Sequence, residues 1–156
     1  MDELRIPKRA VKVDLTRADG TRLEAEVFLA EFASTHVGGE RLSEMLNSGP
    51  FLPARDVSKG QVSFIACHSV AVARVAREIE EDDDAAAHTI PTEHEVKVTL
   101  LGGQSLTGLL TYVMPPERAR LIDYLNGCPL FIPLLEADHL ALINRHHIAT
   151  IETLSR

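Results

Sequence analysis

The sequence predicts a mainly β protein built from two tandem small β-barrels, each with one short helix. Three observations support this prediction. Apolar and polar residues alternate along much of the chain, which is the period of a half-buried strand. Asp-Gly and Gly-Gly pairs separate such runs, as they do in β-hairpins. Finally, one short pattern occurs twice, and the copies start 79 residues apart in a chain of 156 residues.

The repeated pattern reads Arg41-Leu-Ser-Glu-Met-Leu-Asn47 in its first copy and Arg120-Leu-Ile-Asp-Tyr-Leu-Asn126 in its second. Both copies begin with Arg-Leu, carry an acid at the fourth place and end with Leu-Asn. An aromatic, an aliphatic and a proline residue follow each copy, as Phe51-Leu-Pro53 and Phe131-Ile-Pro133. Self-similarity of this kind indicates an internal duplication.

Charge is distributed unevenly and marks the boundary between the two repeats. Residues 78–95 hold eight acidic side chains and no Lys or Arg, whereas the chain on either side is nearly neutral. Because like charges repel, we expect a solvated acidic linker at 78–94, between a first barrel-like repeat at 1–77 and a second at 95–156. Neither repeat has the strongly basic composition that is typical of a nucleic-acid-binding face.

In the first repeat, residues 11–15 and 23–29 alternate around Asp19-Gly20 and predict a hairpin. Residues 40–47 are expected to form a short helix, because Leu42, Met45 and Leu46 share one face. The Asn-Ser-Gly-Pro run that follows is a typical helix end. Three further strands are expected at residues 51–57, 62–66 and 70–74.

The second repeat follows the same plan, with Gly102-Gly103 in the hairpin turn. We match Val96 to Val11 and Gly108 to Ala25. A small residue inside a strand marks a bend or a close approach of another backbone. The expected strands are residues 96–100, 106–113, 130–135, 140–144 and 148–154, with a helix at 118–126 after Pro115-Pro116, since proline is accepted in a first helical turn.

The candidate binding residues are the duplicated Arg and Asn residues together with basic side chains near the fourth and fifth strands of each repeat. His146-His-Ile-Ala149 aligns with His68-Ser-Val-Ala71, which places histidines at matching positions. A structural role also fits the duplicated residues, because Asn is a common helix C-cap and Arg pairs with nearby acids. The candidate set is Arg41, Asn47, His68, Arg120, Asn126, Arg145, His146 and His147.

No catalytic residue, metal site or cofactor is predicted. His139, His146 and His147 near Asp138 have the ligand chemistry of a zinc or iron site. However, His146 and His147 would point to opposite faces if they lay on a strand.

The two cysteines, Cys67 and Cys128, form no CxxC pair. His68 follows Cys67, but neighbours on a strand face apart, and Cys128 follows a helix and does not start one, so neither thiol is expected to be activated. The N-terminal Met-Asp-Glu is not a signal peptide, and no apolar run approaches the roughly 20 residues of a membrane helix. We therefore expect reduced thiols, a cytoplasmic location and no membrane partner.

The stretch from Val96 to Gly108 resembles the first hairpin of the Sm-like family, which includes the Hfq-type bacterial proteins. His147-Ile-Ala-Thr-Ile151 resembles the last strand of that family, where a histidine precedes a similar run. The resemblance implies tandem small SH3-like barrels, self-association through edge strands and the binding of single-stranded RNA. The repeated Arg-Leu-x-acid-x-Leu-Asn and Phe-x-Pro pattern is interpreted as that of a bacterial family.

We expect a non-enzymatic adaptor or regulatory module that acts through protein–protein interaction, with a protein partner or a second copy of itself. Open edge strands pair readily with other chains. The alternative is a divergent Sm-like protein that binds single-stranded RNA through Arg41, Arg120, Arg145 and the histidines. Base stacking needs aromatic or guanidinium platforms, and this chain has only seven Phe and Tyr residues and no Trp.

Overall fold

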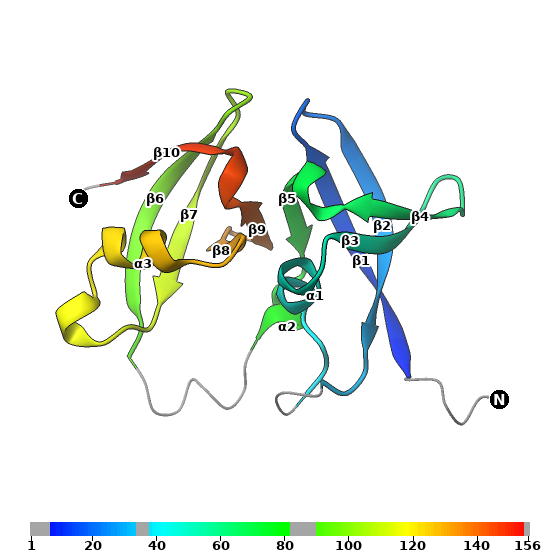
Figure 1. The fold of residues 1–156 in the computed structure, drawn as a ribbon, viewed down its shortest axis with the longest axis horizontal. Helices are drawn as coiled ribbons and strands as arrows, with labels where there is room; N and C mark the ends of the chain where they lie inside the picture. The colour runs from blue at the N-terminus through cyan, green and yellow to red at the C-terminus, as the bar shows by residue number, and fades with distance from the viewer. Residues whose placement is uncertain (1–6, 34–37, 82–89, 155–156) are drawn as a thin grey trace.

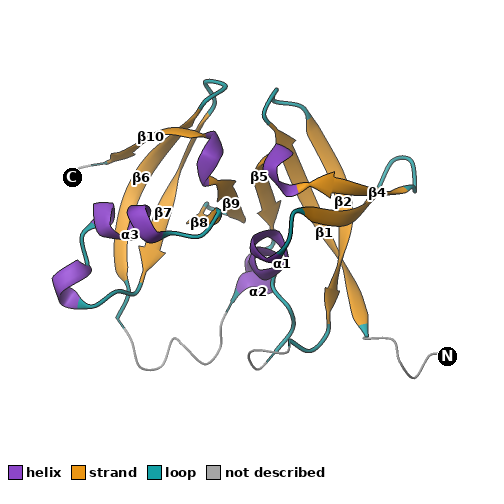
Figure 2. Ribbon diagram, in the orientation of Figure 1, coloured by secondary structure: helices purple, strands orange, loops and turns teal. Residues whose placement is uncertain are grey.

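The computed structural model describes residues 7–33, 38–81 and 90–154 and contains a single large β-sheet (Figures 1 and 2). Strands make up 51% of the described residues and helices 19%, which confirms the prediction of a mainly β protein. The ten strands pair antiparallel in the order β10-β6-β7-β8-β9-β5-β1-β2-β3-β4. This sheet is open and is not closed into a barrel, which differs from the expectation of two separate barrels.

The first half of the chain has the order of five strands and one intervening helix that its periodicity predicts, followed by a short helix that overlaps the expected linker. A three-residue 3-10 turn, η2, which the sequence did not reveal, joins its last two strands. Its elements are β1 (Lys8–Arg17), β2 (Arg22–Ala30), α1 (Leu42–Ser48), β3 (Phe51–Asp56), β4 (Val62–Ala66), η2 (Cys67–Ser69), β5 (Val70–Val75) and α2 (Arg77–Glu80).

The second half repeats this order, and a 3-10 turn, η5, again joins its last two strands. A further 3-10 turn, η4, precedes its helix. Its elements are β6 (Thr92–Leu100), β7 (Ser105–Tyr112), η4 (Pro116–Arg118), α3 (Leu121–Gly127), β8 (Phe131–Leu135), β9 (Leu140–Asn144), η5 (Arg145–His147) and β10 (Ile148–Thr153). None of the helices in the described residues has the length and apolar character needed to cross a membrane.

The hairpin pairings correct one residue match between the halves. Val13 pairs with Ala25, and Val96 pairs with Gly108. Val96 therefore stands at the position of Val13, two residues from the predicted match with Val11. The shift keeps every side chain on its expected face, because the side chains of a strand alternate with a period of two.

Gly108 does occupy the position of Ala25, and the close backbone approach predicted there is present. A Cβ atom on Gly108 would lie 2.5 Å from the carbonyl oxygen of Leu135 and 2.9 Å from Cγ of Leu134. Real Cβ atoms do not come that close to a backbone oxygen. The second half therefore needs glycine where the first half has alanine.

The halves meet where β5 pairs with β9, at the centre of the sheet in Figure 1. In each half the strands follow the spatial order fifth, first, second, third, fourth: β5-β1-β2-β3-β4 and β10-β6-β7-β8-β9. The contact therefore joins the fifth strand of the first half to the fourth strand of the second. The two outermost strands, β10 on the left of Figure 1 and β4 on the right, are again a fifth and a fourth strand.

Both hydrophobic clusters of the protein cross this contact. Phe131 and Leu142 of the second half belong to the cluster of the first half. Ala71 and Val72 of the first half belong to the cluster of the second. Because a unit of this size buries little surface on its own, the shared residues make each half depend on the other.

The region of the predicted acidic linker is partly structured at both ends. Helix α2 includes Glu80, and β6 begins at Thr92. Burial raises the pKa of Glu80, and its Oε2 accepts a hydrogen bond of 3.3 Å from the N–H of Ser43. The two ends of the predicted linker at 78–94 thus belong to α2 and β6, and residues 82–89 lie outside the described residues.

Candidate functional site

Three of the predicted binding residues meet at the joint, which we define as the β5–β9 pair with the turns η2 and η5. Nε2 of His147 lies 2.7 Å from the carbonyl oxygen of His68. The ring centroids of His68 and His146 are 6.1 Å apart. A hydrogen bond thus ties η5 of the second half to η2 of the first.

The placement of the histidines corrects the reasoning about a metal site. His146 and His147 lie on a 3-10 turn, so the opposite-face argument, which held only if they lay on a strand, does not apply to them. His139 lies before β9, and the length of β9 separates it from η5. Across the described ranges, no group of three or more His, Cys, Asp or Glu side chains is arranged to hold a metal ion.

Asn144 is the polar residue buried at the joint, and it was not among the predicted site residues. Its Nδ2 donates to the carbonyl oxygens of Val70 at 3.1 Å and Cys67 at 3.5 Å. Its Oδ1 accepts from the N–H of His146 at 2.9 Å. A buried amide that is satisfied on both sides orients the groups around it. The sequence signal is an Asn that ends an apolar strand, where the first half has Ala66.

The duplicated asparagines differ in their contacts. Oδ1 of Asn47 accepts a hydrogen bond of 2.9 Å from the N–H of Phe131, which fastens α1 of the first half to β8 of the second. Asn126 is exposed, and the part of the chain that the structure describes offers its side chain no hydrogen-bond partner. The expected C-cap role is wrong for both, because the helices end at Ser48 and Gly127.

The three predicted arginines make contacts within their own halves. Arg120 forms two hydrogen bonds with the carboxylate of Asp123, at 2.9 and 3.1 Å, which raise the pKa of the Arg120 guanidinium. Nη1 of Arg145 donates to the carbonyl oxygen of Cys128 at 2.5 Å and holds η5 against the end of α3. Arg41 precedes α1, and its N–H donates to Oε1 of Glu44.

Both thiols are free and buried. Burial raises the pKa of the Cys67 thiol, so it is protonated at neutral pH and is a poor nucleophile. Sγ of Cys128 lies 3.2 Å from the carbonyl oxygen of Leu125 and donates to it. These contacts are those of structural cysteines.

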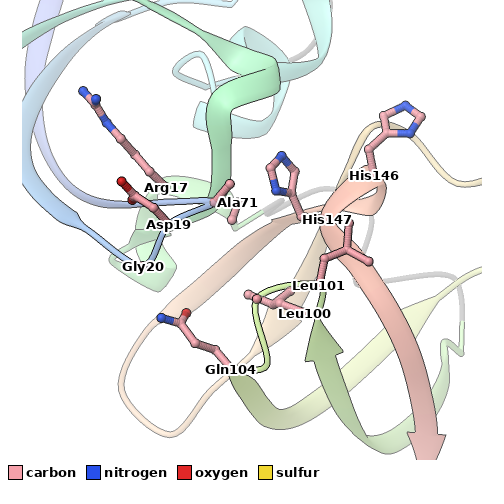
Figure 3. Close-up of a pocket in the computed structure, with 11 residues that line it drawn as sticks. Arg17, Asp19, Gly20, Ala71, Leu100, Leu101, Gln104, His146 and His147 are labelled. Carbon is pink, nitrogen blue, oxygen red and sulfur yellow. The ribbon is translucent and has the colours of Figure 1, made fainter.

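A pocket of about 220 Å³ lies beside the joint, between the hairpin turns of the two halves (Figure 3). Asp19 lines it from the first turn, Gln104 from the second and His147 from η5. The Asp19 carboxylate accepts hydrogen bonds from the N–H and Oγ1 of Thr21, which hold its pKa below the ordinary value. Both hydrogen bonds are accepted by Oδ1 and hold the carboxylate to its own turn.

The outer side of the first half carries a different feature, which we call the β4 edge. It consists of Phe51 on β3 with Val62 and Phe64 on β4, whose exposed fractions are 59%, 52% and 74%. In the second half, Phe131 and Leu142 occupy the positions of Phe51 and Phe64, as the strand registers show, and both are 0% exposed. Sequence periodicity missed the β4 edge, because both halves have the same alternation here.

The β4 edge also lacks the features that usually keep an outer strand from pairing. β4 reads Val-Ser-Phe-Ile-Ala, with no charged residue and no proline. Soluble proteins commonly place charges, proline or a bulge on such a strand, because its unpaired N–H and C=O groups are a template for another chain.

Comparison of the chain with protein-family models, with curated proteins and with solved structures finds no match. The site is therefore interpreted from its own geometry.

Proposed function

We propose that the protein is a non-enzymatic adaptor or regulatory module of the cytoplasm that binds other protein chains through the open edges of its sheet. The β4 edge is the observation that carries this proposal. Its unpaired backbone groups give affinity for an added strand, and its apolar side chains would be removed from water by a partner. Phe64 is the central side chain of this surface.

We also propose that the two halves are copies of one duplicated unit with the Sm-type, SH3-like topology. The strands of the two halves follow the same spatial order, which supports this proposal. So do the equal positions of Ala25 and Gly108 in the two hairpins. In this arrangement the two units share one continuous sheet, because the fourth strand of one unit is covered by the fifth strand of the other.

The experiment that tests the binding function compares two variants with the natural chain in capture from a native lysate. Phe64→Glu places a charge at the centre of the β4 edge, and Val113→Glu places one at another exposed apolar residue. We expect proteins that the natural chain and Val113→Glu retain and that Phe64→Glu loses. Equal retention by all three chains would contradict the proposal.

A second candidate function, the binding of single-stranded RNA, is favoured by one observation. The rings of His68 and His146 lie close together beside Arg145, and both histidines are exposed. Flat cationic or aromatic groups at such a place can stack on bases. It ranks second because Arg120 and Arg145 already make hydrogen bonds within the chain.

Retention of a labelled single-stranded RNA pool on a filter tests the second candidate. Binding that falls with salt and is lost in the double variant His68→Ala, His146→Ala would support it, because phosphate contacts release counterions. The absence of retention at low salt would exclude it.

A further inference from the structure

We infer that a pocket on the polar face of the first half binds the phosphate group of a small, hydroxyl-bearing phosphate ester. The inference goes beyond the proposed function and does not depend on the β4 edge. The pocket has a volume of about 260 Å³, and we call it the arginine pocket. It is lined by Thr16, Gly20, Arg22, Val72, Arg74, Gln104, Ser105 and Leu106.

Strand pairing places the two arginines of this pocket on either side of β1. Thr16 of β1 pairs with Arg22 of β2, and Asp14 of β1 pairs with Arg74 of β5. Paired residues on neighbouring strands lie on the same face of a sheet, as do residues two apart on one strand. Both guanidinium groups therefore stand on one face of the sheet, with β1 between them.

A carboxylate holds each guanidinium group in place and leaves most of its donors free. Nη2 of Arg22 donates to Oδ2 of Asp14 at 2.5 Å, and Nε of Arg74 donates to Oε1 of Glu136 at 2.9 Å. Each guanidinium has several further N–H donors, for which the described residues supply no acceptor. No acidic side chain of the described residues lines the arginine pocket itself. Guanidinium groups with free donors are well suited to phosphate oxygens, which they bind in pairs.

The hydroxyl group of Thr16 supplies a separate observation. Thr16 is 4% exposed, and its Oγ1 has no hydrogen-bond partner in the described part of the chain. A buried hydroxyl without a partner costs free energy, and a valine of the same shape would avoid that cost. An oxyanion in the arginine pocket would supply the missing acceptor, which gives this threonine a reason to be polar.

The hairpin of the second half closes the pocket from the opposite direction. Ser105 begins β7, and Gln104 precedes it in the turn. Gln104 extends toward the turn of the first half, where its Nε2 lies 2.9 Å from the place of a Cβ on Gly20 (Figure 3). Donors thus surround the pocket from two strands and from a hairpin across the joint. This arrangement suits a tetrahedral phosphate group, whose oxygens point in several directions, better than a planar carboxylate.

The second half has no such pair of arginines at the matching positions. Thr99 pairs with Ser105 as Thr16 pairs with Arg22, so a serine stands at the position of Arg22. Glu152 stands at the position of Arg74, because it pairs with Lys97, the counterpart of Asp14. The strand topology that the halves share therefore does not require two arginines here.

A larger pocket of about 540 Å³ shares Arg22 and Arg74 with the arginine pocket and offers room for the organic part of the ligand. It adds the carboxylates of Asp14 and Glu24, which pair across β1 and β2. Oδ1 of Asp14 is buried and has no hydrogen-bond partner in the described residues. Hydroxyl groups of a ligand would donate to these carboxylates. Because the same carboxylates offset part of the arginine charge, inorganic phosphate alone should bind more weakly than the ester.

Calorimetric titration of the intact chain at constant ionic strength is the first test. The probes are inorganic phosphate, glucose 6-phosphate, glucose and acetate. We expect weak binding of phosphate, binding of glucose 6-phosphate that is several-fold tighter, and no binding of glucose or acetate. The absence of binding by both phosphate compounds would overturn the inference. Acetate that binds as well as phosphate would overturn the assignment of a phosphate group.

Substitutions in the arginine pocket test its location. Arg22→Gln should weaken the binding of inorganic phosphate about tenfold or more, because a charged donor is lost. Arg55→Gln removes the same charge from β3, outside the pocket, and should bind like the natural chain. Thr16→Val should weaken phosphate binding several-fold while the empty chain melts at the same temperature or higher. Unchanged binding in both Arg22→Gln and Thr16→Val would overturn the inference.

The variant Glu24→Gln tests the place of the organic part. It should reduce the advantage of glucose 6-phosphate over inorganic phosphate, since an acceptor for a hydroxyl group is weakened. Its affinity for inorganic phosphate should not fall, because Glu24 lies outside the arginine pocket. Equal affinities of the natural chain for phosphate and glucose 6-phosphate would overturn the assignment of a hydroxyl-bearing ester.

Discussion

The fourth strands of the two halves, β9 and β4, occupy the same place in the same order of strands but have different surroundings. β5 covers β9, and Leu142 is fully buried. No strand in the described residues covers the outer side of β4, and Phe64 is exposed there. One position in a repeated topology thus becomes core or surface according to the strand next to it.

The two fourth strands also differ in their polar contacts, which are found beside β9 at the joint. At the joint, Asn144 is buried with its amide satisfied, and Arg74 pairs with Glu136. Arg77 also donates to the carbonyl oxygens of Glu136 and Ala137, at 2.6 and 2.7 Å. These contacts stabilise the joint, whereas the β4 edge presents apolar side chains and unpaired backbone groups.

The largest difference between the halves should appear when the matched apolar residues are truncated. We expect Leu142→Ala to lower the free energy of unfolding by about 2–5 kcal/mol, because it leaves a cavity in a shared core. Phe64→Ala should change it by about 0.5 kcal/mol or less, since its side chain is mostly in solvent. Urea denaturation at a concentration where the chain is monomeric measures both. Equal losses would mean that the β4 edge is already covered within one chain.

The hairpin position shared by Ala25 and Gly108 should give the next largest effect. Gly108→Ala should cost about 1–3 kcal/mol, because its Cβ would overlap the backbone of Leu135. Ala25→Gly, the reverse change at the matching position, should cost about 1 kcal/mol through added backbone freedom. Thermal denaturation of both variants checks this order. If Gly108→Ala left the stability unchanged, β8 would have to be able to move away from β7.

The two asparagines of the repeated pattern offer a smaller contrast. Asn47→Ala should lower the free energy of unfolding by about 1 kcal/mol, because the N–H of Phe131 loses its acceptor. Asn126→Ala should stay within about 0.5 kcal/mol in the single chain. Denaturation curves of the monomeric variants make the measurement. A comparable loss for Asn126→Ala would assign it a structural contact within its own half.

The hairpin turns of the two halves should give the smallest difference, which lies in how each turn's contribution to stability changes at acidic pH. Hydrogen bonds from Thr21 lower the pKa of Asp19 below 3.8 in the folded chain, and Gly102 stands at this place in the second half. A lowered pKa adds stability that is fully present above the unfolded value and is lost as the pH falls through the folded value. The advantage of the natural chain over Asp19→Asn should therefore shrink below about pH 4. An advantage that is constant from pH 2 to 6 would contradict this.

Much of the candidate site could not be predicted from the sequence, for a physical reason. The pattern placed His68 and His146 at matching positions, and the structure brings their turns together. The sequence predicts a break between the fourth and fifth strands of each repeat, but three residues are too few to show the 3-10 turn that forms there. Asn144 and Phe64 were missed because their importance comes from what lies beside them, which the local pattern does not record.

Sequence patterns alone predict the mainly β class, the order of the strands and of helices α1 and α3, the hairpin turns and the need for a small residue at Gly108. These features follow from apolar periodicity and turn chemistry, which act over a few residues. Tertiary packing pairs β5 with β9, leaves the sheet open, and buries Leu142 while Phe64 stays exposed. The paired residues Ala73 and Leu142 are far apart in the chain, and their contact depends on how two whole units pack.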